Sequence, residues 1–174
     1  MQQTEWFPIV TETGERIGKA TRKECHSGSF LLHPVVHLHV FNAKKQLFLQ
    51  QRAANKDIQP NKWDTAVGGH VDDGESIQIA LVREAYEELK IKDFSANFLF
   101  QYPFRSQVEH ELVHSFWVQY DFPIQANLEE IQDARFWEID EIKNSLGKQL
   151  FTPNFEDEFT KLLSHPDIIQ FLHP

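Results

Sequence analysis

The stretch GHVDDGESIQIALVREAYEELKI, residues 69–91, decides the fold of this chain. Its second half has the hydrophobic period of an α-helix, which completes a turn every 3.6 residues. We expect one side of this helix to be apolar and to pack on a core, formed by Ile79, Val82, Ala85, Tyr86 and Leu89. The remaining chain must then supply the surface on which this side packs.

Acidic side chains gather on the other side of the predicted helix. Glu84, Glu87 and Glu88 lie one turn apart, at the spacings i, i+3 and i+4. Arg83 is the nearby cation and is placed to pair with Glu87. A solvated charged face is the commoner origin of such a group. A divalent cation with oxygen ligands would also offset the repulsion between these carboxylates.

The residues before the helix favour the metal-binding interpretation. Gly68, Gly69 and Gly74 allow a tight approach of the backbone. Glu75 and Ser76 stand at the helix start, where negative charge and a capping oxygen are favourable. The sequence therefore predicts a loop and helix whose carboxylates face the loop, an arrangement suited to a diphosphate bridged by metal ions.

This stretch resembles the Nudix box, G-x5-E-x7-R-E-U-x-E-E-x-G-U, in which U is aliphatic. The positions that match in one register are Gly69, Glu75, Arg83, Glu84, Ala85, Glu87, Glu88 and Ile91. Lys90 departs from the pattern, because the family has a glycine there. Such a glycine usually takes a left-handed conformation as the chain leaves the helix, so the exit geometry at Lys90 is the feature in doubt.

The resemblance implies an α/β (α+β) fold, a Nudix α/β/α sandwich in which helices flank a mixed central sheet. Residues 1–174 would form one Nudix domain, with an N-terminal hairpin at about 5–20 and the box at 69–91. Alternating polarity and turn signals predict the other elements. The expected strands are 35–41, 46–51, 94–102, 111–120 and 134–139, and the expected helices are 140–146 and 153 to about 165.

Composition limits the functional classes. The chain has 174 residues with 41% hydrophobic residues, and its formal net charge is −9. An acidic chain is a poor partner for the nucleic-acid backbone, and no apolar run is long enough to span a bilayer. Cys25 is the one cysteine and the N-terminus lacks signal-peptide character, so we expect a reducing, cytoplasmic location. The oligomeric state is left open.

The resemblance also implies roles for individual residues. Mg²⁺, or Mn²⁺, would be held by Glu84, Glu87, Glu88 and the carbonyl of Gly68. Glu84 is the candidate that positions or deprotonates water, and Arg83 would hold a neighbouring carboxylate, so the predicted catalytic residues are Glu84, Arg83 and Glu87. The substrate would be a small-molecule diphosphate.

Glu5–Gln119 also resembles the branch of the superfamily that contains type I isopentenyl-diphosphate isomerases and related hydrolases. This resemblance implies a second metal site, at His26, His33, His70, Glu109 and Glu111. Arg52 and Lys56 match the cations that bind the diphosphate in those isomerases. The remaining strand histidines, His37, His39 and His114, are expected to be packing or surface residues.

Two observations favour a hydrolase over an isomerase. The isomerases need an acid–base cysteine where this chain has Gly68, and no motif places Cys25 in that role. The box also keeps its acidic set. We therefore expect a Mg²⁺-dependent Nudix hydrolase that acts on a nucleoside diphosphate derivative or related diphosphate. The alternatives are an isopentenyl-diphosphate isomerase with an unusual acid, and a non-catalytic nucleotide-binding Nudix domain.

Overall fold

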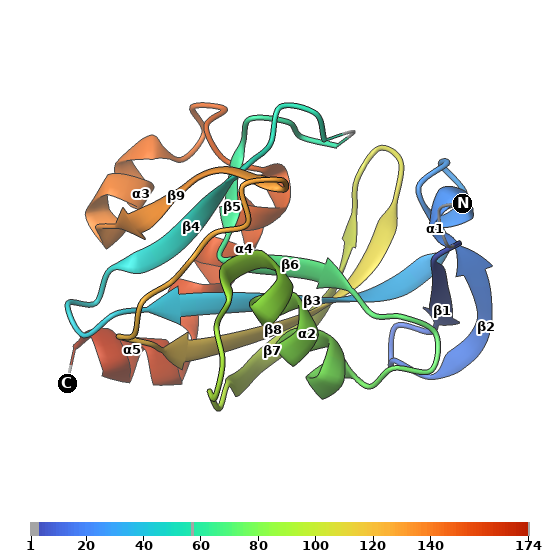
Figure 1. Ribbon diagram of the computed structural model, residues 1–174, viewed down its shortest axis with the longest axis horizontal. Helices are drawn as coiled ribbons and strands as arrows, with labels where there is room; N and C mark the ends of the chain where they lie inside the picture. The colour runs from blue at the N-terminus through green and yellow to red at the C-terminus, as the bar shows by residue number, and fades with distance from the viewer. Residues whose placement is uncertain (1–3, 57, 174) are drawn as a thin grey trace.

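The computed structural model describes residues 4–56 and 58–173. Figure 1 shows the arrangement of the helices and strands. In chain order they are β1 (Trp6–Val10), β2 (Arg16–Thr21), α1 (Arg22–Cys25), β3 (Leu32–Phe41), β4 (Leu47–Arg52), β5 (Trp63–Thr65), β6 (Val67–His70), α2 (Ile77–Leu89), β7 (Asn97–Arg105), β8 (His110–Gln119), β9 (Ile131–Trp137), α3 (Ile139–Ser145), α4 (Pro153–Ser164) and α5 (Pro166–Leu172).

The central strand of the main sheet is β3. Within the described residues, seven strands form this mixed sheet, in which β3 and β8 are parallel and the other pairs are antiparallel. The middle of β3, from Val35 to Leu38, pairs with β6, and its last two residues pair with β4. The sheet therefore divides on this side of β3, and Gly68 of β6 lies beside the division.

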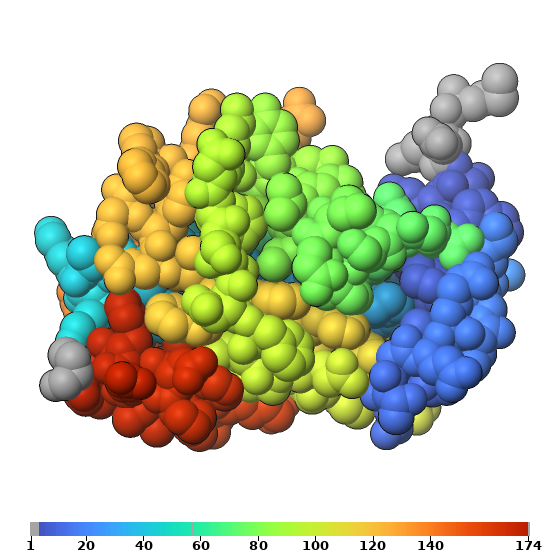
Figure 2. All heavy atoms as spheres, turned by 90° about the horizontal axis from the view of Figure 1, so that it is seen from below, coloured from blue at the N-terminus to red at the C-terminus, as the bar shows by residue number. Residues whose placement is uncertain are grey.

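Helices cover both faces of the sheet, as Figure 2 shows with α2 and the C-terminal helices on opposite sides. On one face, Val36, Leu38 and Val40 of β3 join a buried cluster with α2. Phe41 belongs to a second cluster with α3, α4 and α5 on the other face. Because successive side chains of a strand point to opposite faces, one strand contributes to both cores. The predicted α/β/α sandwich is confirmed.

The N-terminal hairpin, β1 and β2, is a separate two-stranded sheet beside the N-terminal end of β3 (Figure 1). Arg16 on β2 pairs with Asp73 in the loop before α2, with 2.8 Å between Nη2 and Oδ1. The backbone N–H of Asp73 also donates to the carbonyl of Trp6, at 2.8 Å. These contacts tie the hairpin to the loop that leads into the box helix.

Most of the elements predicted from the pattern are present, with shifted ends. The strand predicted at 94–102 begins at Asn97 and ends at Arg105, and α5 was not predicted. The short helix α1 follows the hairpin, and a capping box between Thr21 and Glu24 begins it. No helix in the described part of the chain has the length and apolar character that a membrane span requires.

Candidate active site

The box helix begins as its sequence predicts. Ser76 is the N-cap, and its side chain accepts a hydrogen bond from the backbone N–H of Ile79. At the other end, Lys90 has φ 55° and ψ 23°, which is the left-handed region. The side chain of Ile91, the next residue, is fully buried, so the exit from the helix follows the direction of the family pattern although a lysine carries the strain.

The face of α2 that packs on the sheet differs from the prediction. Ala85 and Leu89 are buried as expected, but Ile79, Val82 and Tyr86 are exposed by 61%, 53% and 42%. The true buried side is formed by Ala80, Leu81, Ala85, Glu88 and Leu89. Glu88 was expected on the side opposite the apolar residues, but it lies on the packed side of the helix.

Glu88 is a buried carboxylate with neutral partners. Its Oε2 accepts hydrogen bonds of 3.1 Å from the Gly68 backbone N–H and from Gln50 Nε2. Burial, together with the nearby charge of Glu84, raises the pKa of Glu88 to about 8. A bound cation would supply the positive charge that this carboxylate lacks.

The Glu84 side chain of α2 lies directly against Gly69 of β6. A Cβ atom built on Gly69 would lie 1.9 Å from Cδ of Glu84, so only glycine leaves room for this side chain. Burial raises the pKa of Glu84 to about 7 even though Arg83 is adjacent. A carboxylate with a pKa near neutrality is suited to accept a proton from water.

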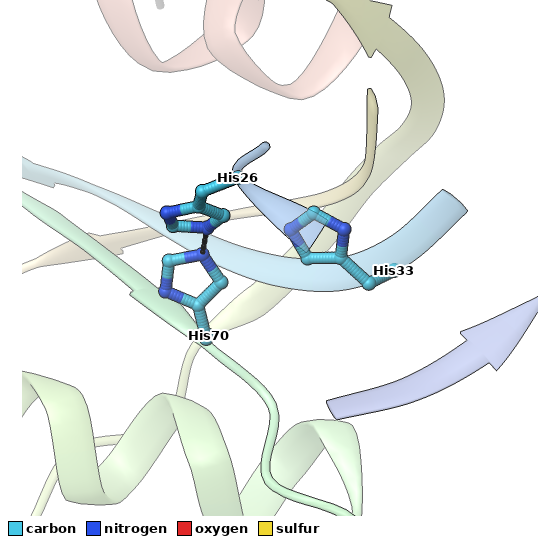
Figure 3. Close-up of side chains that lie close together, drawn as sticks. All are labelled: His26, His33 and His70. Atoms are coloured by element: carbon cyan, nitrogen blue, oxygen red, sulfur yellow. Dashed lines mark hydrogen bonds between the residues drawn. The ribbon is translucent and has the colours of Figure 1, made fainter. Parts of the chain in front are cut away.

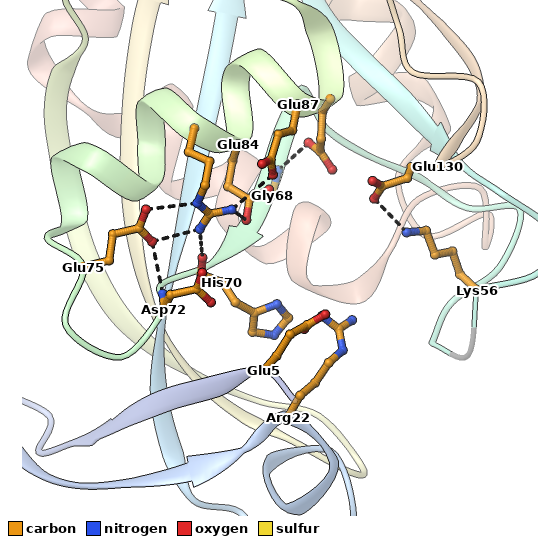
Figure 4. Close-up of polar contacts among 12 residues, drawn as sticks. Glu5, Arg22, Lys56, Gly68, His70, Asp72, Glu75, Glu84, Glu87 and Glu130 are labelled. Atoms are coloured by element: carbon orange, nitrogen blue, oxygen red, sulfur yellow. Dashed lines mark hydrogen bonds and ion pairs between the residues drawn. The ribbon is translucent and has the colours of Figure 1, made fainter. Parts of the chain in front are cut away.

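Arg83 joins the loop to the helix through three acidic side chains, Glu75, Glu84 and Glu87, which Figure 4 shows. Its guanidinium bonds Glu75 through Nε and Nη2, at 3.0 and 2.9 Å, and the carbonyl of His70 at 2.9 Å. It also lies 2.8 Å from Glu84 and 3.2 Å from the exposed Glu87. The hydrogen bonds that Arg83 donates to Glu75 are the main cause that raises the pKa of Arg83. The predicted ion pair with Glu87 is present, and the same guanidinium nitrogen contacts Glu84.

Glu130 belongs to this region, although it is part of no motif in the sequence. It lies directly before β9, and its charge contributes to the raised pKa values of both Glu84 and Glu88. Its Oε2 pairs with Lys56 Nζ at 3.1 Å, and Figure 4 shows this pair across from the box helix. Lys56, predicted to bind substrate, therefore has an acidic partner within the site.

The histidines predicted for the second metal site come together in the structure. One ring nitrogen from each of His26, His33 and His70 lies within 4.8 Å of the others. They come from the C-cap of α1, from β3 and from β6, as Figure 3 shows. Nε2 of His26 lies 3.0 Å from Nε2 of His70. Among the described residues, no other histidine, cysteine or acidic side chains form so compact a group.

The predicted acidic partners lie beside these histidines. Glu109 Oε2 is 3.4 Å from His26 Nε2. Glu111 faces His33 across the β3–β8 pairing. Burial, followed by the charge of Glu109, raises the pKa of Glu111 to about 8. Phe7 of β1 stacks on His70 with ring centroids 4.3 Å apart, so the N-terminal hairpin forms part of this cluster's wall.

Both residue sets fit bound cations. Nε2 of His33 is buried and has no hydrogen-bond partner, and burial lowers the pKa of His33, which favours the neutral form that ligates metals. At the box, burial raises the pKa values of Glu84 and Glu88, and Arg83 is the cation in contact with Glu84. Oxygen ligands of this kind suit Mg²⁺ or Mn²⁺.

A cavity of about 650 Å³ is lined by His26 and His70 of the histidine cluster and by Gly68 and Gly69 of β6. The box carboxylates are not among the residues that line it, but Gly68 donates to Glu88 and Gly69 lies against Glu84. Arg52 and Lys56, the predicted phosphate-binding cations, both line it. Arg52 already donates to the carbonyl of Ile58 at 3.1 Å and lies 3.7 Å from Asp64.

Three further lining or supporting residues were not selected from the sequence: His37, Asn154 and Glu158. His37 and His39 were expected to be packing or surface residues; both are buried, and both are hydrogen-bonded to Glu158 on α4. The pattern alone contains one signal, a glutamate on the apolar side of a helix that follows Pro153. Residues separated by more than a hundred positions become neighbours only through the fold.

Comparison with known proteins agrees with this geometry. The family model described as "NUDIX domain" matches residues 31–161. The chain is 28% identical over 165 residues to isopentenyl-diphosphate Delta-isomerase 1 of Photorhabdus laumondii, covering 90% of this chain and 94% of that protein. It is 34% identical over 154 residues to an uncharacterized Nudix hydrolase of Listeria monocytogenes, covering 87% and 89%.

Solved structures share the fold. The crystal structure of DR0079 from Deinococcus radiodurans matches with a TM-score of 0.77 at 23% identity, covering 90% of this chain and 98% of that one. The NUDIX domain of Shewanella oneidensis NrtR, solved with ADP ribose, matches with a TM-score of 0.59 at 15% identity, covering 74% and 84%. At these identities the likeness concerns the fold alone.

Proposed function

Because this chain belongs to the Nudix family, we propose that it is a Mg²⁺-dependent hydrolase that cleaves a diphosphate linkage. The substrate would be a nucleoside diphosphate derivative or a related organic diphosphate. The observation that carries this proposal is the pair of acids Glu84 and Glu88, whose pKa values are raised to about 7 and about 8 beside a cavity lined by Arg52 and Lys56. The carboxylates would bind the metal ion and the cations would bind phosphate oxygens, and a metal-assisted attack on phosphorus needs both.

The side chains of the box divide the work. Glu84, Glu87, Glu88 and the carbonyl of Gly68 would hold the metal. When bound, Mg²⁺ supplies neutralising charge at phosphate oxygens and increases the acidity of water. Glu84 would position the attacking water and accept its proton, because its pKa is close to the working pH. Arg83, fixed by Glu75, would hold the Glu84 carboxylate in this orientation.

The cations of the cavity would receive the phosphate farther from the attacked one. Arg52 offers a planar guanidinium that binds phosphate through two hydrogen bonds. Lys56 would exchange its contact with Glu130 for a substrate oxygen, which would also release the Glu130 carboxylate toward the box. The histidine cluster would hold a second cation that supports the structure or the diphosphate.

Isomerisation of isopentenyl diphosphate is the second candidate, favoured by the compact group His26, His33 and His70 and by the isomerases among the relatives. The residues needed to move a proton on carbon argue against it. Gly68 offers no titrating group, and Cys25 is fully buried, which raises its pKa to about 11. A non-catalytic nucleotide-binding domain is the third candidate, against which the complete acid set of the box weighs.

The test is a panel of nucleoside and organic diphosphates incubated with Mg²⁺ or Mn²⁺. We expect release of phosphate or a monophosphate, and Glu84→Gln should slow it by about 100-fold or more, the scale of general-base catalysis. Glu129→Gln, an exposed acid next to Glu130, is the charge-matched control and should retain the wild-type rate. If the wild type hydrolyses none of the panel but binds a nucleotide tightly, the non-catalytic alternative replaces this proposal.

A further inference from the structure

The cavity is lined by a histidine, His37, whose ring orientation is fixed by a hydrogen bond to a buried glutamate. His37 on β3 is 8% exposed and lines the cavity. Its Nδ1–H donates to Glu158 Oε2 at 2.6 Å, and the other oxygen of this fully buried carboxylate accepts from His39 Nε2 at 3.0 Å. The second ring nitrogen, Nε2, faces Gly68, because a Cβ atom built there would lie 3.6 Å away from it. The ring is therefore held with Nε2 at the cavity wall.

An asparagine beside it is fixed in the same way. Asn154, in the first turn of α4, is 9% exposed and lines the cavity. Its Oδ1 accepts a hydrogen bond of 2.7 Å from the hydroxyl of Tyr102 on β7. This contact assigns the amide nitrogen, Nδ2, to the open side, where it has no hydrogen-bond partner among the described residues. Two nine-tenths-buried polar side chains thus direct unsatisfied nitrogen atoms into one cavity.

Acceptors line the same space. The carboxylates of Asp64 and Glu111 both contribute to the cavity wall. A hydroxyl group both donates and accepts hydrogen bonds, so a hydroxyl-bearing ligand can satisfy this mixture of groups. A hydrocarbon would cover the same polar atoms without replacing their water, which is unfavourable.

We propose that His37 and Asn154 select the organic group carried by the diphosphate, and that they favour a hydroxyl-bearing group such as a sugar over a hydrocarbon. This inference rests on the proposed diphosphate substrate and adds the residues that decide its selectivity. Glu158 and Tyr102 are positioning residues, each of which fixes one of the two selective side chains by a single hydrogen bond. The arrangement also explains why a carboxylate is buried in α4.

The test compares two probes, ADP-ribose as the hydroxylated diphosphate and dimethylallyl diphosphate as the hydrocarbon one. Dissociation constants are measured by calorimetry, and hydrolysis is measured separately with Mg²⁺. Asn154→Leu keeps the approximate volume of the side chain and removes its hydrogen bonds. We expect it to weaken ADP-ribose binding by about tenfold, the value of one or two hydrogen bonds, through KM more than kcat. Binding of dimethylallyl diphosphate should be unchanged or tighter.

Two further variants separate selection from support of the fold. Tyr102→Phe leaves Asn154 in place but frees its amide, so the selectivity should fall in the same direction by a smaller factor. Asp157→Asn, at an exposed position of the same helix, should change neither dissociation constant. His37→Gln should also lower the preference for ADP-ribose, with the melting temperature measured to show that the variant is folded.

The outcomes are distinct. The inference is overturned if the wild type binds neither probe, or if Asn154→Leu leaves the ratio of the two dissociation constants unchanged. An equal loss for both probes also overturns it, because the residue would then support the fold or the phosphate site. If the ratio shifts as expected but no bond is hydrolysed, the selectivity stands and the proposed hydrolysis fails. If hydrolysis occurs but the ratio of the two dissociation constants is unchanged, the proposed hydrolysis stands and the inferred selectivity is overturned.

Discussion

The carboxyl group of Glu84 fills the space that a side chain at Gly69 would need: a Cβ atom on Gly69 would lie 1.9 Å from Cδ and 2.3 Å from Oε1 of Glu84. Gly69 is therefore needed because the Glu84 carboxyl group lies against it. Its φ angle is not positive, so the backbone conformation does not require a glycine here. The backbone of β6 approaches α2 where a side chain cannot fit.

Gly69→Ala should displace the Glu84 carboxyl group, because the atoms that the new Cβ would meet all belong to this flexible side chain. We expect hydrolysis to fall by at least tenfold, whereas the free energy of unfolding should change little, because the side chain can rotate away. Gly68→Ala is the matched control, because its Cβ would make ordinary contacts of 3.6–3.7 Å, and it should lower hydrolysis less. Equal losses of activity in the two variants would contradict the steric explanation.

Removal of the buried charge at Glu88 should have opposite effects on stability and on metal binding. The pKa of Glu88 is raised to about 8, so its ionised form destabilises the metal-free protein as pH rises from 4.5 toward 8. Glu88→Gln should therefore raise the melting temperature at pH 8.5 without metal, by roughly 5 °C or more. It should also abolish most of the further rise that Mg²⁺ gives the wild type, and slow hydrolysis by orders of magnitude.

Glu87→Gln provides the comparison, because Glu87 is exposed and pairs with Arg83 at 3.2 Å. This variant should slow hydrolysis strongly but leave the melting temperature of the metal-free protein nearly unchanged. If Glu88→Gln retains the wild-type response to limiting Mg²⁺ in both melting temperature and rate, Glu88 is not a ligand.

The contact between α4 and β3 should make stability depend on pH. Burial alone would lower the pKa of His37, but the charge of Glu158 outweighs it and raises the pKa to about 9. The stabilisation is fully present below pH 6.5, the ordinary value, and is lost as pH rises through 9. From this pair we expect a loss on the order of 3 kcal/mol between pH 6.5 and 9.5.

At acidic pH the same contact loses its stabilising effect as pH falls, which is the opposite direction. The charges of His37 and His39 overcome burial and hold the pKa of Glu158 well below 4.5, so this stabilisation is present above 4.5 and lost as pH falls through the lower value. Urea unfolding across pH 5–9.5 measures both limits. Glu158→Gln should be less stable at pH 6.5 and should show a flatter decline toward pH 9.5. A decline as steep as that of the wild type would assign the pH dependence to other groups.

Lys90 carries backbone strain that a glycine would relieve. Its φ of 55° lies in the left-handed region, which is unfavourable for a residue with a Cβ atom. Lys90→Gly should raise the free energy of unfolding by about 1 kcal/mol, reduced by the loss of the Lys90 ammonium over the Tyr86 ring. Lys90→Ala is the control, because it loses the same ring contact without relieving the backbone. A melting temperature no higher for the glycine variant than for the alanine variant would disprove this account.

The chain should not isomerise isopentenyl diphosphate. Glu111 could supply one proton-transfer group, but Gly68 supplies none, and Cys25 is fully buried. Purified protein with Mg²⁺ should therefore yield no dimethylallyl diphosphate above a blank. Product that survives Cys25→Ala would reveal an unrecognised acid, whereas product lost in Cys25→Ala would mean that the cysteine reaches the cavity.

The sequence by itself determined the family, the layered fold and the box in its register. These follow from local rules: helix period, strand alternation, the cap at Ser76 and the glycine positions. It did not determine which side of the box helix is buried. Ile79 and Val82 are exposed, because apolar residues need not lie inside a protein. Glu88 is buried, because Gln50 and the backbone N–H of Gly68 donate hydrogen bonds to its carboxylate.

Tertiary structure alone decided how the distant groups meet. The resemblance implied that His26, His33 and His70 converge, and the structure shows how: the end of α1, the start of β3 and the end of β6 lie together. Glu158 meets His37 across 121 positions because α4 packs on the face to which the odd-numbered residues of β3 point. The sequence periodicity fixes the face to which a strand residue points, but the element that covers this face depends on how the whole chain packs.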